Sequence, residues 1–285
     1  MAAALHHLLQ MALKATESFS SSSIEAIKNY YTTNGYLVDQ YMRKALATVK
    51  SEKDKTIVKS IIHIFYQPWL ENITNKFQKL VAQDASIFTS QTAVAENETF
   101  VLFVDAFRYE LAEEFCNRLS NHKWKVSLQA GWSAIPSLTP TAKPNVSPIA
   151  TVVSVQSGIA EFRPQLQNGK DLLTPVFRDA LKVEGYTLVT NARDIKSEGK
   201  YWQEIGDIDT KGHEEQADMV KRIQELFDQV QEALDVAFER GVKKIKIVTD
   251  HGWLLLPGGL PKTQLNAGLT ETRWGRCALI KDGAS

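Results

Sequence analysis

A short segment near the end of the chain combines an acid, an imidazole and a glycine in Val248-Thr249-Asp250-His251-Gly252. It continues the run Ile245-Lys246-Ile247-Val248, whose β-branched residues are typical of a strand. Carboxylates and imidazoles are metal ligands, and open α/β sheets place their sites at the carboxyl ends of their strands. Because many strands end in such a pair by chance, a metal site is predicted only if further ligands converge on Asp250 and His251.

Further candidate ligands stand at comparable places in the chain. Asp105 ends the apolar run Thr99-Phe100-Val101-Leu102-Phe103-Val104, which is typical of a strand buried on both faces. Asp209 and His213 are the first and last residues of a five-residue segment that precedes a long predicted helix. Asp207 is an alternative to Asp209 as a ligand. In a chain that alternates strands and helices with right-handed crossovers, these positions fall on one edge of the sheet.

A hydroxyl group belongs to the same set. Thr139 precedes Pro140, and because proline suits the first turn of a helix, Thr139 is the predicted N-cap. The backbone N–H groups at such a helix start also favour an anion. Thr139 is therefore either a capping residue or a nucleophile, with Ser137 and Thr141 as alternative hydroxyls.

The chemistry of the set favours phosphoryl transfer. Its members are three carboxylates, two imidazoles and one hydroxyl: Asp105, Asp209, Asp250, His213, His251 and Thr139. One tetrahedral zinc ion binds fewer ligands, whereas two divalent ions about 3.5–4 Å apart would use them all. One ion would activate Thr139 for attack on phosphorus, the other would neutralise the departing oxygen, and water would then hydrolyse the phospho-threonine. The plainer alternative is that these side chains are solvated or cap helices.

The elements that position these residues fall into two predicted parts. Residues 1–95 form a helical N-terminal region, with apolar stripes behind Ser21-Ser22-Ser23 and again from Ile57 to Leu80, where Pro68 predicts a kink or a break. The polar segment Ala82 to Asn97 is the predicted linker. Residues 96–285 form the second part.

The second part alternates strands with helices, which predicts an α/β fold with a mostly parallel sheet. Helices are expected over 108–121, over 172–183 and from beyond 213 to 240. Strands are expected over 126–128, 186–190 and 276–280, in addition to the two strands before Asp105 and Asp250. The stretch 194–208 is expected to be irregular.

Composition limits the classes of protein that the chain can belong to. Lys plus Arg and Asp plus Glu both number 33 in 285 residues, so no overall charge attracts nucleic acid or lipid, although Lys243, Lys244 and Lys246 form a local basic run. The two cysteines, Cys116 and Cys277, match no zinc or redox spacing, which indicates a reduced cytoplasmic location. No apolar run approaches the roughly 20 residues of a membrane span, and the first residues lack the features of a signal peptide.

The ordered motifs resemble a known family. Asp209-Thr210-Lys211-Gly212-His213 followed by Asp250-His251-Gly252 resembles the metal motifs of the alkaline phosphatase superfamily. The segment Val104 to Glu110, together with Ile135 to Pro140, more closely resembles the PglZ domain, a component of the bacterial BREX phage-defence system. The resemblance covers roughly residues 98–285, and these four motifs occur in family order.

The resemblance implies a three-layer α/β/α fold and specific metal ligands. Asp105, Thr139, Asp250 and His251 would bind one zinc ion, with Thr139 as nucleophile, and Asp209 and His213 would bind the other. It also implies a cytoplasmic phosphatase or phosphodiesterase whose partners are other BREX proteins, with nucleic acid as another possible partner. Arg108 would contact a phosphate or pair with Glu110 or Glu113 on its own helix.

One departure from the family pattern supports an alternative. The superfamily completes the second metal site with a later histidine, and no histidine follows His251 here. PglZ proteins are also longer than this chain, so the chain is expected to be a fragment that ends before that ligand or a family member with one weak metal site. The alternative function is a catalytically inactive module that keeps the fold and binds other defence proteins or DNA.

Overall fold

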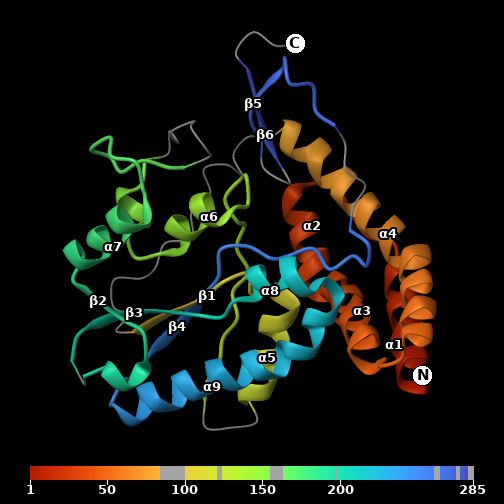
Figure 1. The fold of residues 1–285 in the computed structure, drawn as a ribbon, viewed down its shortest axis with the longest axis horizontal. Helices are drawn as coiled ribbons and strands as arrows, with labels where there is room; N and C mark the ends of the chain where they lie inside the picture. The colour runs from red at the N-terminus through yellow and green to blue at the C-terminus, as the bar shows by residue number, and fades with distance from the viewer. Residues whose placement is uncertain are drawn as a thin grey trace.

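The computed structural model describes residues 1–83, 100–120, 124–154, 163–196, 198–259, 264–273 and 277–281, and Figure 1 labels its elements. The helices are α1 (Ala2–Ala15), α2 (Ile24–Tyr30), α3 (Tyr36–Thr48), α4 (Glu52–Gln83), α5 (Tyr109–Ser120), α6 (Thr139–Val146), α7 (Thr174–Val183), α8 (Ile208–Glu215) and α9 (Ile223–Glu239). The main strands are β1 (Phe100–Val104), β2 (Tyr186–Val189), β3 (Lys200–Ile205) and β4 (Ile245–Val248). Within the described ranges, no helix is long and apolar enough to cross a membrane.

Strands β1 to β4 form one parallel sheet in the order β2-β3-β1-β4. Strand β1 lies inside the sheet, where Phe100 pairs with Tyr201 of β3 on one side and with Ile245 of β4 on the other. Because the strands run in the same direction, their carboxyl ends share one edge. The predicted α/β class with a parallel sheet is therefore confirmed.

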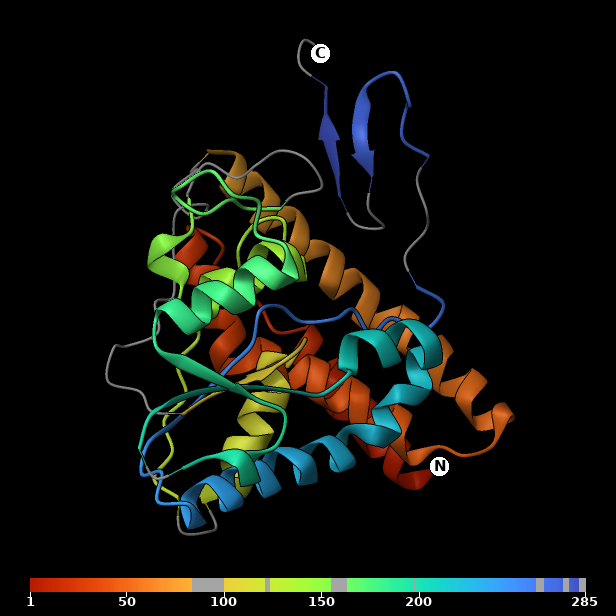
Figure 2. The same cartoon turned by 60° about the vertical axis from the view of Figure 1, so that its left-hand side comes forward.

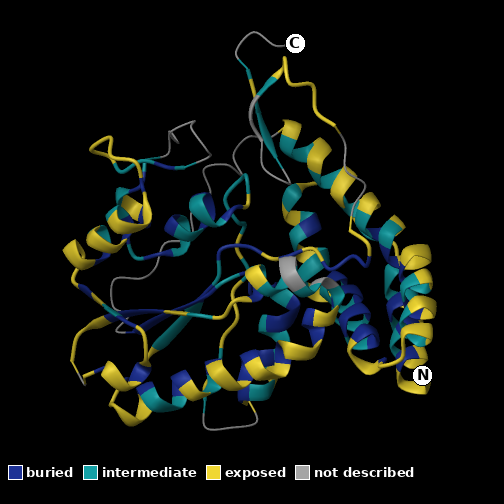
Figure 3. Ribbon diagram, in the orientation of Figure 1, coloured by how far each residue is buried: buried dark blue, intermediate teal, exposed yellow. Residues whose placement is uncertain are grey.

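Helices cover both faces of this sheet, since α7 lies on the opposite side from α5 and α9 in both Figure 1 and Figure 2. Alternate residues of β1 point to the two faces. Phe100, Leu102 and Val104 join an apolar cluster that includes α5 and α9. Val101 and Phe103 join a second cluster that includes α7. All five residues of β1 are buried, as Figure 3 shows for the centre of the sheet, which explains its unbroken apolar sequence.

The N-terminal helices share their core with the sheet. Leu8 of α1, Met42 of α3 and Ile62 of α4 are buried in the same apolar cluster as Leu102 of β1. Two buried ion pairs reinforce this contact: Arg43 of α3 pairs with Glu110 of α5 at 3.0 Å, and Asp39 of α3 pairs with Arg108 at 2.7 Å. The predicted boundary between residues 95 and 96 lies outside the described residues, and the division into two domains stays a prediction.

The prediction of an irregular stretch from 194 to 208 is wrong for Lys200–Ile205, which form β3. Its polar residues hide the strand pattern, and two of them have contacts with other segments, although Gln203 Oε1 is buried with no hydrogen-bond partner among the described residues. Lys143 Nζ lies 2.6 Å from Glu204 Oε2, and Gln203 Nε2 donates to the Thr190 carbonyl at 3.4 Å. A strand in the interior of a sheet can therefore carry polar side chains when other elements supply their partners.

Other predicted elements also differ from the structure. Residues 126–128 have no regular structure, so the strand predicted there is wrong. Among the described residues, the last strand, β6 (Ala278–Ile280), pairs with β5 (Thr270–Arg273) in a separate antiparallel sheet and not with β1 to β4. The long helix predicted beyond 213 is instead α8, a 3-10 helix over Gln216–Arg222 and α9. Helix α4 continues through Pro68, so the break predicted there as an alternative to a kink does not occur.

Replacement of Leu102 by alanine tests the position of the shared core. Leu102 is fully buried in β1, so Leu102→Ala should lower the free energy of unfolding by about 2–5 kcal/mol through lost burial and a residual cavity. Leu9→Ala is the matched control, because Leu9 is 57% exposed on α1, and it should change that free energy by less than about 0.5 kcal/mol. Equal effects of the two changes in urea denaturation would contradict this assignment of the core.

Candidate metal centre

Three candidate ligands meet at the carboxyl edge of β1 and β4. Asp105 follows β1, and Asp250 and His251 follow the neighbouring strand β4. Each residue offers one ligand atom, and these atoms lie within 4.8 Å of one another. We call Asp105, Asp250 and His251 the acid–imidazole cluster. Asp250 and His251 are buried, with only 2% and 5% of their surface exposed, and Asp105 is partly buried.

Hydrogen bonds between the two strand ends hold the cluster. The Phe107 amide donates to Thr249 Oγ1 at 2.9 Å, and the Ala106 amide donates to Asp250 Oδ1 at 3.3 Å. Ser133 Oγ donates to the Asp250 carbonyl at 2.6 Å. Ala106 has a φ of 53°, a conformation that residues other than glycine rarely adopt and that such surrounding contacts maintain. The supporting roles of Thr249 and Ser133 were not predicted, because a single hydroxyl near a strand end has no distinguishing pattern.

The hydrogen bonds of His251 fix its tautomer when the ring is neutral. Its Nδ1 lies 2.9 Å from the Gly252 carbonyl oxygen, which can only accept a hydrogen bond, so Nδ1 carries the proton. The lone pair of a neutral ring is then on Nε2, which lies 3.5 Å from Asp250 Oδ2. An imidazole whose orientation is set by a backbone carbonyl is the usual arrangement of a histidine metal ligand.

Thr139 lies beside the cluster but does not cap α6. The residue at the N-cap position is Leu138, in an extended conformation, and Thr139 is the first helical residue, so the predicted capping role is wrong. Its Oγ1 lies instead 3.0 Å from His251 Nε2. Of the alternative hydroxyls, Ser137 is exposed, and Thr141 is 8% exposed in the next turn. The Thr139 hydroxyl thus meets the ligand nitrogen of His251 directly.

The second predicted ligand pair is only partly described. Asp209 lies in the first turn of α8, and its charge contributes to the raised pKa of Asp105, so it is within electrostatic reach of the cluster. His213 lies in the same helix, but its side chain is outside the described part of the structure. A second cation site at Asp209 and His213 therefore stays a prediction.

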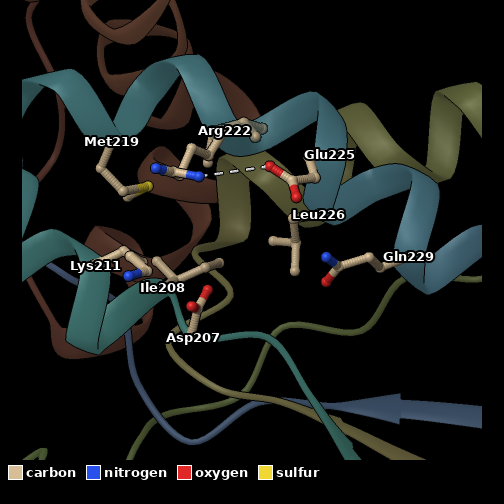
Figure 4. A pocket seen from close by; sticks show the side chains of 9 residues that line it. Asp207, Ile208, Lys211, Met219, Arg222, Glu225, Leu226 and Gln229 are labelled. Carbon is tan, nitrogen blue, oxygen red and sulfur yellow. Dashed lines mark ion pairs between the residues drawn. The ribbon is translucent and has the colours of Figure 1, made fainter. Parts of the chain in front are cut away.

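Asp207, the alternative to Asp209, belongs to a different pocket. Figure 4 shows the Asp207 carboxylate between α8 and the segment that contains the 3-10 helix and α9. The same pocket is lined by Lys211, Arg222 and Glu225, and Arg222 pairs with Glu225 at 3.7 Å. Its lining residues do not include Asp105, Asp250 or His251, which favours Asp209 over Asp207 as the acid that faces the cluster.

Burial raises the pKa of Asp105 from its ordinary value of 3.8 to about 7, and the charge of Asp250 adds to the shift. His251 and Lys143 act in the opposite direction and do not cancel it. The folded protein therefore holds a proton on Asp105 that the unfolded chain loses near pH 4. Stability of the cation-free protein should fall as the pH rises from about 4 to about 7.

The donor set fits a divalent cation. In the described part of the chain, Asp105 Oδ1 and Asp250 Oδ2 are buried and have no hydrogen-bond partner. Such oxygens are costly to bury unless a donor or a cation satisfies them. Two carboxylates and an imidazole whose unprotonated Nε2 can bind a cation in place of its contact with Thr139 Oγ1 would hold zinc with one position open, as catalytic zinc sites do.

Arg108 has a different principal partner from those predicted. Its Nη2 lies 2.7 Å from Asp39 Oδ1 of α3, whereas its Nε lies 3.9 Å from Glu110 Oε1. The side chain is only 6% exposed. The pairing with Glu110 is thus the more distant contact, and the pairing with Asp39 was not predictable because the two residues are far apart in the sequence.

Comparison with protein-family models, curated proteins and solved structures finds no match to this chain.

The pH dependence of stability tests the electrostatics of the cluster. In chelator, Asp105→Asn should melt at a higher temperature than the wild type at pH 8, because it removes a buried charge next to Asp250, and the difference should shrink toward pH 4. Added zinc should stabilise the wild type but not Asp105→Asn. Asp228→Asn, at an exposed carboxylate of α9, is the control and should follow the wild type. If the melting temperatures of wild type and Asp105→Asn change with pH in parallel, the raised pKa of Asp105 is contradicted.

Proposed function

We propose that this chain is a metal-dependent phosphoester hydrolase with Thr139 as its nucleophile. The proposal is carried by the 3.0 Å distance between Thr139 Oγ1 and His251 Nε2, beside two carboxylates whose ligand atoms lie within 4.8 Å of that imidazole. A hydroxyl, an imidazole and paired carboxylates in one place are the groups that covalent phosphoryl transfer requires. Candidate substrates are phosphomonoesters, cyclic or linear nucleotides and the nucleic-acid backbone.

Each residue of the site has a distinct role in the proposed reaction. Asp105, Asp250 and His251 would hold a divalent cation, which lowers the pKa of a nearby hydroxyl and neutralises charge on phosphoryl oxygens when bound. With His251 holding the cation, Thr139 would lose its proton to solvent water and attack phosphorus; the leaving oxygen would depart and take up a proton from water, and a water molecule would then hydrolyse the phospho-threonine to phosphate and free Thr139. Nε2 has one lone pair, so His251 can either accept the Thr139 proton or bind a cation, but not both at once. Asp209 and His213 would contribute to a second cation.

The more specific proposals depend on the motif resemblance alone. We propose an alkaline phosphatase-like domain of the PglZ type, zinc as the metal, and a role in a cytoplasmic BREX defence complex whose other proteins are the partners. The parallel sheet with helices on both faces is compatible with that domain. The position of the metal ligands at the carboxyl edge is also what such an α/β enzyme requires.

The alternative function is a catalytically inactive module that binds other proteins of the complex. It is favoured by Leu5, Leu9 and Leu13, which form one row along α1 and are 47%, 57% and 53% exposed. Exposed apolar rows of this kind are found at protein interaction surfaces. Binding and catalysis use different parts of the chain, so turnover measurements distinguish the two functions.

Turnover of chromogenic substrates by wild type and Thr139→Ala tests the proposal. With zinc present, the wild type should hydrolyse bis(4-nitrophenyl) phosphate or 4-nitrophenyl phosphate, and Thr139→Ala should reduce the rate by about 10³-fold or more because the nucleophile is lost. Ser137→Ala, which removes an exposed hydroxyl two residues away, is the matched control and should retain wild-type turnover. If zinc-loaded wild type and Thr139→Ala are equally inert, the hydrolase proposal fails and the binding module is favoured.

A further inference from the structure

Arg108 lies directly against the segment that carries Asp250 and His251. A Cβ atom added at Gly252 would lie 3.1 Å from Arg108 Cγ, so glycine at this position lets the arginine stem approach the backbone closely. The guanidinium carbon lies 5.2 Å from the centre of the Trp253 ring, within the range of a cation–π contact. The two residues that follow His251 are therefore both packed against one side chain.

The other end of Arg108 is held by the N-terminal helices. Its Nη2 lies 2.7 Å from Asp39 Oδ1, and Asp39 itself accepts hydrogen bonds from Tyr66 Oη at 2.6 Å and Tyr31 Oη at 2.5 Å. Asp39 is in α3, Tyr66 is in α4, and Tyr31 is in the π-helical segment between α2 and α3. Asp39 and Arg108 are 5% and 6% exposed, so solvent screens their interaction weakly.

This arrangement requires an arginine. Its planar guanidinium can stack on Trp253 while its fork reaches Asp39, whereas a lysine ammonium is a point charge with no plane to stack. The ligand cluster lies next to these contacts, because His251 immediately precedes Gly252. A shift of the Arg108 side chain would change the position of the backbone that carries His251.

We propose that Arg108 is a positioning residue of the metal centre, through which the N-terminal helices set the affinity of the acid–imidazole cluster for a divalent cation. This inference depends on the metal centre of the proposed function. Cation binding and the packing of Asp39 against Arg108 are then linked, and each stabilises the other.

A matched pair of buried arginines separates positioning from general stability. Buried Arg43 of α3 pairs with the buried Glu110 at 3.0 Å and with the partly exposed Glu114 at 2.6 Å, both on α5. Arg43→Lys disturbs the interface between the helices and the sheet at these residues, whereas Arg108→Lys also disturbs the packing on Gly252 and Trp253. Both changes should lower the melting temperature, but only Arg108→Lys should change cation affinity.

The zinc dissociation constant should be measured for wild type, Arg108→Lys and Arg43→Lys by competition with a chelating dye, below the melting temperature of each. Arg108→Lys should weaken zinc binding by about 10- to 100-fold, the range found when residues that support metal ligands are changed. Arg43→Lys should bind zinc as the wild type does. Tyr31→Phe removes one hydrogen bond to Asp39 without touching Arg108, and it should weaken zinc binding in the same direction by a smaller factor.

The outcomes are distinguishable. Wild-type zinc affinity in both Arg108→Lys and Tyr31→Phe would overturn the inference and leave the metal centre intact. If Arg108→Lys does not fold, the zinc affinity of Tyr31→Phe tests the inference: weaker binding than in the wild type supports it, and wild-type binding overturns it. Equal losses of affinity in Arg43→Lys and Arg108→Lys would show that loosening the interface is enough, which also overturns the specific role of Arg108. A wild type that does not bind zinc would contradict both the metal centre and this inference.

Discussion

Two carboxylates and an imidazole are held close together inside this protein, and the rest of the site is built around their mutual electrostatics. Asp105 and Asp250 repel one another when both are ionised, and burial strengthens that repulsion. Within the described residues, Asp105 Oδ1 and Asp250 Oδ2 have no hydrogen-bond donor. A cation between them and His251 Nε2 would turn an unfavourable arrangement into a favourable one, which is why we interpret the cluster as a binding site.

The fold supplies the rigidity that such a cluster requires. Asp105 follows β1, which is buried on both faces between β3 and β4. The backbone beyond β1 is bonded to Thr249 and Asp250, so the two strand ends form one unit. The N-terminal helices contribute a further support through the buried pair of Asp39 and Arg108. Buried ion pairs add little net stability in general, and this one is better explained by the geometry that it maintains.

The sequence predicted the parts of the molecule that depend on local pattern. The unbroken apolar run of β1 and the β-branched run of β4 located the two strands whose ends carry Asp105, Asp250 and His251. Strand β3 was missed because Gln203 and Glu204 interrupt its apolar pattern, and their partners Thr190 and Lys143 come from elsewhere in the chain. A local pattern cannot show that a polar residue in a strand has a distant partner.

The same limit applies to the site. Thr139 was correctly associated with a helix start, but its contact with His251, 112 residues away, depends on tertiary structure. The pairing of Arg108 with Asp39 and the pairing of Arg43 with Glu110 both join α3 to the chain beyond β1. Helical periodicity identified helices before residue 95, but it could not show that they share a core with the sheet and contact the residues beside the cluster.

The central claim is that Asp105, Asp250 and His251 bind one cation next to Thr139. Anomalous diffraction at the zinc absorption edge, from a crystal grown with zinc, tests it most directly. We expect a peak about 2.0–2.2 Å from a carboxylate oxygen of each aspartate and from His251 Nε2. A well-ordered crystal with no peak there, or with zinc bound only at other residues, would contradict it.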